Sequence, residues 1–239
     1  MKKQLRLEML PQPDSTTCGP TCLHAVYRYF GDPVSLSQVI AEVPSLEGGG
    51  TLGVMLANHA LQRGYRATIF TYNLMVFDPT WFLPGVDIPE KLRLRRRATG
   101  KSKQKKAIDA YLKFLGAGGV IEFEDPGRKL LRRFLKSERP ILTGLNSTFL
   151  YRAKRSNQVT QQDDDIHGEV DGHFVVLSGY DQEKKTIHIL DPYDENPYAE
   201  RAYDAPIDRV LGAMLLGVMT YDANFVIIEP RAKRKVSLT

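Results

Sequence analysis

The chain has 239 residues, of which 42% are hydrophobic and 26% are charged. This composition is typical of a globular protein and excludes disordered, collagen-like and fibrous proteins. Lys and Arg number 33 against 28 Asp and Glu, giving a formal charge of +5 that does not by itself indicate a nucleic-acid partner. The length suits one large domain, and we expect a single domain over residues 1–239.

The cysteine content and the termini indicate a protein of a reducing compartment. Two cysteines cannot form a disulfide framework, and no Cys and His residues have the spacing of structural zinc ligands. The charged N-terminus lacks the apolar core of a signal peptide. The longest uncharged apolar stretch, Val210 to Tyr221, is too short to span a bilayer. We therefore expect a cytoplasmic protein without a membrane span.

The first third of the chain predicts helices followed by a strand. Apolar residues at helical spacing and stops at Gly31 and Gly64 support this pattern. Pro20 suits the first turn of the first helix, because the N–H that proline lacks has no partner there. Thr51 is expected to cap the third helix. The predicted helices lie near 18–30, 36–42 and 52–63, and the strand at 65–72.

The middle of the chain, residues 74–138, has a different character. Residues 91–106 contain nine Lys and Arg and no acidic residue. Amphipathic runs follow at 108–115 and 130–135, separated by glycines. We expect 74–138 to be a mostly helical insertion whose basic segment is partly exposed.

The last third is rich in β-branched and aromatic runs separated by turn residues, as expected for strands. Residues 181–185 suit a hairpin connection. Helices followed by an antiparallel sheet predict an α+β fold. The predicted strands are 140–145, 174–180, 187–190 and 225–228.

Four residues could form a catalytic site. Cys18 stands at the start of a helix, where unpaired N–H groups and the helix dipole favour a thiolate. His173 opens a hydrophobic strand, and Asp191 ends the next one, so a hairpin would bring them to the same end of the sheet. Asp191 could then orient the imidazole toward Cys18. The amide of Gln12 could stabilise an oxyanion beside the Cys18 N–H.

These residues and their surroundings resemble cysteine peptidase family thirty-nine, the papain-like peptidases that remove double-glycine leaders from bacteriocin precursors. The similar segments are Gln12 with Thr17-Cys18-Gly19-Pro20, the run 50–70, Pro140-Ile141-Leu142, His173-Phe174-Val175-Val176 and Asp191-Pro192. The resemblance implies a papain-like fold and a stand-alone peptidase without the exporter that carries familiar members. It also implies Cys18 as nucleophile, His173 as general base, Asp191 as its orienting residue and Gln12 as oxyanion donor.

The sequence thus predicts a cysteine-dependent hydrolase that cleaves a peptide or related amide through an acyl-enzyme. We expect a peptide or protein substrate and no metal or organic cofactor. Two alternatives remain open at this stage. The same site could transfer the acyl group or deamidate, or the fold could serve as a binding protein whose basic insertion contacts nucleic acid or an acidic partner. Residues 91–106 lack the interleaved aromatics that stack on bases, which disfavours nucleic acid.

Several other residues have simpler interpretations. Cys22 lies one helical turn after Cys18 and is expected to pack in the core rather than to bind a metal. His24 and His59 are interpreted as core or surface residues, and His188 receives no role. The acidic loop 163–171 could be a solvated loop, or it could border the cleft and favour basic substrates or a cation. The loop 48–50 could admit a substrate backbone or be a plain turn.

Overall fold

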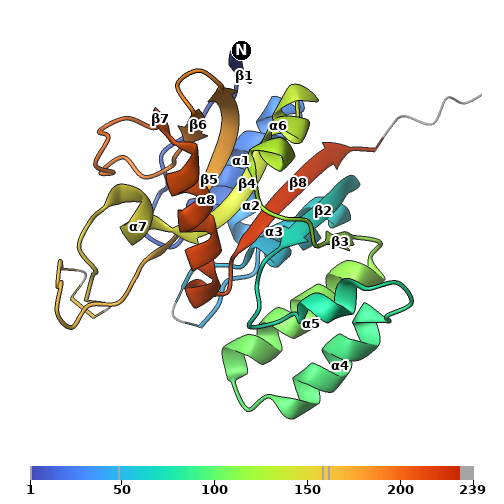
Figure 1. Cartoon of the computed structure of the whole chain (residues 1–239). Helices are drawn as coiled ribbons and strands as arrows, with labels where there is room; N and C mark the ends of the chain where they lie inside the picture. The colour runs from blue at the N-terminus through green and yellow to red at the C-terminus, as the bar shows by residue number, and fades with distance from the viewer. Residues whose placement is uncertain (1, 48, 158, 161, 232–239) are drawn as a thin grey trace, which may run out of the picture.

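A single sheet lies at the centre of the protein, whose structure is a computed structural model that describes residues 2–47, 49–157, 159–160 and 162–231. The strand order is β3-β2-β8-β4-β5-β6-β7, with β1 paired to β5 (Figure 1). Neighbouring strands of the described residues are antiparallel except β2 and β3, which are parallel. The strands are β1 (Lys2–Gln4), β2 (Tyr65–Thr71), β3 (Val120–Glu122), β4 (Ile141–Asn146), β5 (Gly172–Asp181), β6 (Thr186–Leu190), β7 (Ala202–Pro206) and β8 (Asn224–Pro230).

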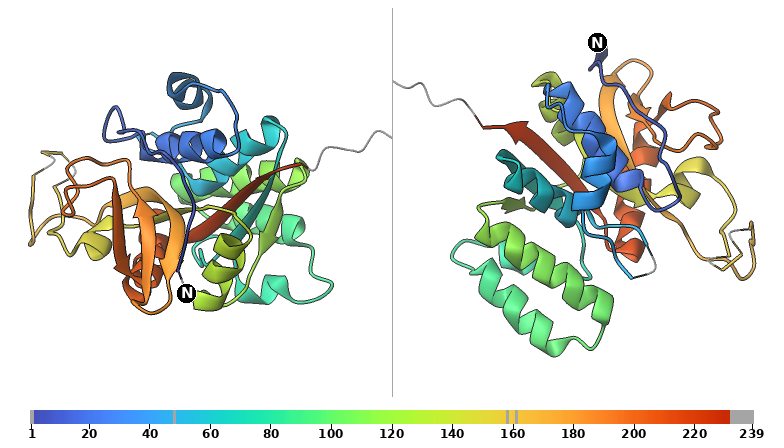
Figure 2. Two further views of the ribbon diagram at one scale, coloured as in Figure 1. Left: turned by 90° about the horizontal axis from the view of Figure 1, so that it is seen from above. Right: turned by 180° about the vertical axis from the view of Figure 1, so that it is seen from behind.

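Helices cover both faces of this sheet, because the central strands are apolar on both sides. In β5, Phe174 and Val176 pack into one core while Val175 and Leu177 pack into the other. The first core also holds α1 (Cys18–Tyr29), α3 (Gly53–Gln62) and α5 (Ser102–Gly116). The second holds α6 (Arg128–Lys136) and α8 (Ile207–Leu216). Seen from above, α1 and α6 lie on opposite sides of the sheet (Figure 2, left).

The helices and strands predicted for the first third are present. Helix α1 begins at Cys18, α2 covers Leu36–Glu42, and α3 is followed by β2. The predicted cap of α3 is wrong. Leu52 is its N-cap residue, and the Thr51 hydroxyl donates instead to the Pro44 carbonyl at 2.9 Å. The α3 N-terminus is capped from a distant part of the chain, which local sequence cannot reveal.

Residues 74–138 form several short elements. The 3₁₀ helix η1 (Pro79–Phe82) precedes α4 (Ile88–Ala98), which packs on α5 as an antiparallel pair at the lower right of Figure 1. Strand β3 then joins the sheet beside β2, and α6 packs against its second face. The limits of an insertion therefore stay a prediction, since elements of this segment contribute to both cores.

The last third contains the predicted strands and some elements that the sequence did not indicate. Strands β5 and β6 form the expected hairpin over residues 181–185. The apolar run from Val210 lies in α8 and the 3₁₀ helix η2 (Gly217–Thr220), while α7 (Ser147–Tyr151) follows β4 directly. Within the described residues, none of the helices has the length and apolarity needed to cross a membrane.

Candidate active site

Cys18 is the first residue of α1 and lies at the wall of a cavity of about 850 Å³. Thr17, the N-cap residue, makes no side-chain cap hydrogen bond, so the positive end of the helix is left to act on the thiol. The next residue, Gly19, is required by close packing. A Cβ there would lie 2.7 Å from the Thr51 side chain and 3.2 Å from Phe174. Glycine thus lets the start of α1 approach β5 beside His173.

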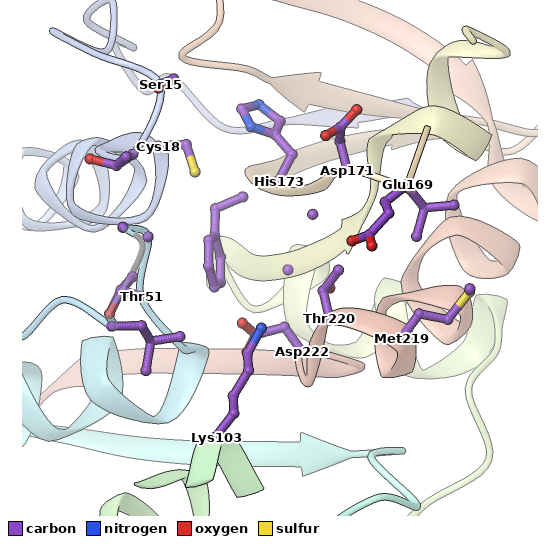
Figure 3. A pocket seen from close by; sticks show the side chains of 18 of the residues that line it. Ser15, Cys18, Thr51, Lys103, Glu169, Asp171, His173, Met219, Thr220 and Asp222 are labelled. Atoms are coloured by element: carbon purple, nitrogen blue, oxygen red, sulfur yellow. The ribbon is translucent and has the colours of Figure 1, made fainter. Parts of the chain in front are cut away.

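His173 and Asp191 meet as the predicted hairpin requires. The Nε2 atom of His173 lies 2.7 Å from Oδ1 of Asp191. The other ring nitrogen, Nδ1, is not engaged by Asp191, and the Cys18 thiol contributes to raising the pKa of His173. Figure 3 shows the Cys18 sulfur and the His173 ring at the same end of the cavity. The structure therefore brings together the thiol, the imidazole and the carboxylate that the sequence analysis selected, while their catalytic roles stay predictions.

Asp191 is fully buried and receives four hydrogen bonds. Its Oδ1 accepts from His173 and from the Tyr193 N–H at 3.0 Å. Its Oδ2 accepts from the hydroxyls of Tyr151 at 2.7 Å and Tyr203 at 2.8 Å. The sequence analysis did not identify the two tyrosines, because they lie on α7 and β7, which it did not predict. They hold the carboxylate in place and satisfy the oxygen that does not contact His173.

These contacts determine the charges of the pair. Burial raises the pKa of Asp191, but the positive charge and hydrogen bond of His173 outweigh burial and hold that pKa below its usual range. Burial lowers the pKa of His173, but the charge and hydrogen bond of Asp191, with a smaller contribution from Cys18, raise it to about 10. The site therefore favours an imidazolium beside the thiol at neutral pH.

Gln12 lies near these residues, and its hydrogen bonds are with the backbone of Asp14 and Pro192. Its backbone N–H donates to the Pro192 carbonyl at 2.9 Å, which ties the segment before α1 to the residue after Asp191. Its side-chain Nε2 donates to the Asp14 carbonyl at 2.9 Å. One amide hydrogen remains for other acceptors. The role of Gln12 as oxyanion donor stays a prediction.

The cavity continues away from Cys18 and His173 and is lined by both acidic and basic side chains. Glu169 and Asp171 of the acidic loop border it on one side, so part of this loop lines the cleft. Lys103 and Lys106, from the first turns of α5, also line it, and Figure 3 shows Lys103 entering from this helix. Among the described residues, no group of three or more acidic, His or Cys side chains could hold a metal ion.

The predicted glycine loop also contributes to the cavity. Gly49 and Gly50 line it, and both have positive φ values, +93° and +72°. Gly48 lies outside the described residues. Nothing in these contacts distinguishes a substrate-binding loop from a plain turn.

One buried acid of the cavity was missed by the sequence analysis. Asp222 is 5% exposed and lies between η2 and β8. Its Oδ1 accepts the N–H of Gly53, the first residue of α3, at 2.7 Å, and thus supplies the cap that Thr51 does not. Burial raises the pKa of Asp222 to about 7. A lone Asp after a tyrosine carries no sequence signal for such a position.

The remaining Cys and His residues have the structural surroundings expected for them. The Cys22 thiol is fully buried and donates to the Phe174 carbonyl at 3.2 Å, and burial raises its pKa well above the ordinary value. His24 and His59 are both buried in helices. His188 lies on β6, with Nδ1 at 2.9 Å from Oδ1 of Asp204.

Comparisons with known proteins concern the family and the fold of the chain. Residues 104–210 match the model of the Peptidase_C39 like family. The matched segment contains His173 and Asp191, while Gln12 and Cys18 precede it. This match confirms the resemblance to family thirty-nine and supports a peptidase function. A search of the curated proteins gives no match.

Solved structures support the fold. A protein from Bacillus anthracis described as a C39-like peptidase has a TM-score of 0.53 at 15% identity, over 98% of this chain and 100% of its own. At this identity the likeness shows the fold, and it confirms the predicted α+β papain-like architecture.

Two further structures are similar at TM-scores of 0.45, too low to carry an argument. One is a double glycine motif protease from an AMS/PCAT transporter in complex with the leader peptide, 15% identical over 96% of this chain and 95% of its own. The other is xylellain, a cysteine protease from Xylella fastidiosa, 13% identical over 97% of this chain and 86% of its own.

Proposed function

We propose that the protein hydrolyses peptide bonds with Cys18 as nucleophile, His173 as acid and base, and Asp191 as the residue that orients the histidine. The position of His173 supports this proposal most strongly. Its Nε2 is held by a buried carboxylate at 2.7 Å, which leaves Nδ1 available, and its ring lies at the same end of the cavity as the thiol at the start of α1 (Figure 3). A peptide or protein is the substrate that suits a cavity of about 850 Å³ open beside the thiol.

The reaction follows from this geometry. The Cys18 thiolate attacks the carbonyl carbon, forming a C–S bond while the carbonyl electrons move to oxygen. The Cys18 N–H and the free amide hydrogen of Gln12 stabilise that oxygen. His173 gives its Nδ1 proton to the leaving amine as the C–N bond breaks. Water then attacks the thioester, His173 accepts a proton from it, and the acid product leaves Cys18.

The chain offers a matched pair of variants that tests this proposal. Cys18→Ala should abolish cleavage of a denatured protein or peptide library, a loss of at least about a thousandfold. Cys22→Ala removes the same side chain one helical turn away and should keep the activity, because Cys22 is buried against Phe174. Mass spectrometry of the products measures both. Equal activity in Cys18→Ala and the unmodified protein would exclude Cys18 as nucleophile.

Alkylation tests the primed state of the thiol without a known substrate. Iodoacetamide should modify Cys18 rapidly at pH 6 to 7, as intact mass will show, because an imidazolium stands beside it. His173→Ala should slow this labelling at the same pH. A rate that is the same in both proteins would contradict the role of His173.

A further inference from the structure

We infer that Asp222 is a specificity-determining residue of the cleft and that it selects substrates with a positively charged side chain, lysine or arginine. This inference rests on the proposed peptidase function, since it concerns the same cavity. It assigns a role to a buried acid that the catalytic mechanism does not use. Asp222 lines the same cavity as Cys18 and His173, but it contacts neither of them among the described interactions.

One of the two oxygens of the Asp222 carboxylate accepts hydrogen bonds from the protein. Its Oδ1 accepts from the Gly53 N–H at 2.7 Å and, at 3.5 Å, from the Asn224 amide. Within the described residues, no hydrogen bond or ion pair within 4.0 Å reaches Oδ2. The residue is 95% buried and lines the cavity, and Oδ2 is not among the enclosed side-chain atoms without a partner, so this oxygen is open to the cavity and can accept from a ligand.

The surrounding backbone keeps space for this carboxylate. A Cβ at Gly144 on β4 would lie 2.7 Å from the Cβ of Asp222, so a side chain there would displace it. The Asp222 N–H donates to the Gly217 carbonyl at 2.9 Å, which holds the residue at the end of η2. The carboxylate is thus positioned by backbone contacts on β4, η2 and α3 rather than by a mobile loop.

One basic side chain of the protein, Lys103, lies near Asp222, with its Nζ 5.3 Å from the centre of the Tyr221 ring. The exposed side chain of Lys103 extends from α5 into the cavity toward Asp222 (Figure 3). Its charge lowers the pKa of Asp222, although the effect is smaller than that of burial. Lys103 lies beyond ion-pair distance and is exposed, so a lysine or arginine side chain of a substrate can approach the carboxylate more closely.

The test uses dipeptidyl acyloxymethyl ketones, which alkylate an active-site cysteine and carry lysine, norleucine or glutamate at either position. At pH 8, the lysine probe should label Cys18 at least about tenfold faster than the norleucine probe at one of the two positions. Asp222→Asn should bring this ratio close to one while leaving the norleucine rate unchanged. Asparagine keeps an oxygen for the Gly53 N–H, so the cap of α3 is preserved.

Glu169→Gln is the matched control, because it removes the same charge at the border of the same cavity. It should change the ratio of the lysine and norleucine rates less than twofold. If Glu169→Gln changed the ratio of the lysine and norleucine rates more than Asp222→Asn did, Glu169 would determine the selectivity and the inference would be overturned.

Failure of the inference can be distinguished from failure of the proposed function. If iodoacetamide and all three probes leave Cys18 unlabelled, the peptidase proposal fails. If the norleucine or glutamate probe labels Cys18 at least as fast as the lysine probe, the peptidase proposal stands and the role of Asp222 is wrong. This last result needs no variant, so it decides the question even if Asp222→Asn does not fold.

Discussion

Two buried aspartates lie near the candidate site, Asp191 against His173 and Asp222 on the wall of the cavity, and their environments shift their pKa values in opposite directions. Asp191 receives four hydrogen bonds and faces His173, which holds its pKa below the usual range despite burial. Asp222 receives two bonds on a single oxygen, and burial raises its pKa to about 7. The difference shows that burial alone does not determine the charge of a carboxyl group; the donors around it do. Both oxygens of Asp191 have donors within the protein, whereas Oδ2 of Asp222 has none among the described residues.

The largest expected effect is that of Asp191→Asn. Without the carboxylate charge the pKa of His173 falls, because burial is then no longer outweighed. Peptide cleavage should fall by about a thousandfold or more, and Cys18 alkylation at pH 6 should slow. Asp204→Asn is the control, since Asp204 also accepts from a histidine, His188, but outside the cavity. Equal losses in both variants would show that Asp191 acts through stability only.

Asp222→Asn should change the pH dependence of stability. The pKa of Asp222 is about 7 in the folded protein and about 3.8 when unfolded, so the folded state binds the proton more tightly. The contribution of Asp222 to the free energy of unfolding therefore falls as pH rises from about 4 to about 7, by up to about 4 kcal/mol. The asparagine variant lacks this term. Urea unfolding at pH 4 and pH 8 measures this effect. The free energy of unfolding of Asp222→Asn, relative to that of the unmodified protein, should be higher at pH 8 than at pH 4. The same difference between the two proteins at both pH values would contradict this prediction.

The smallest effects concern the two tyrosines on Asp191. Tyr151→Phe and Tyr203→Phe each remove one donor to Oδ2 while the other remains. Each should lower the free energy of unfolding by about 1–2 kcal/mol, as expected for a hydrogen bond to a charged group. The double variant should lose more than the sum, because Oδ2 is then buried without a donor. Urea unfolding at pH 7 measures all three, and strict additivity would mean that the hydroxyls do not share this role.

The sequence was most informative where chemistry and local structure coincide. The start of α1 at Cys18 follows from helical spacing and from Pro20, and the β5–β6 hairpin follows from alternating apolar runs and a polar turn. These two elements are enough to predict that His173 and Asp191 meet at one sheet end. Helical spacing also accounts for the buried position of Cys22, because it places this side chain on the face of α1 that packs against β5.

Other features have no local pattern to reveal them. The cap of α3 comes from Asp222, which lies 169 residues later in the chain, so Thr51 was given a role that another residue performs. Tyr151 and Tyr203 reach Asp191 from α7 and β7, two short elements without strong periodicity. The segment 74–138, predicted to be a mostly helical insertion, also contains β3, which pairs with β2, and α6, which packs into the second core.

The sequence by itself predicted that Cys18 begins a helix and that His173 and Asp191 meet at one end of the sheet, because each stands at the end of an element whose apolar pattern is local. Only the tertiary structure decided which hydroxyls surround Asp191, what caps α3, and that Lys103 and Asp222 face the same cavity. These contacts join residues far apart in the chain, and their energies depend on burial. Burial is a property of the packed molecule, and no segment carries it alone.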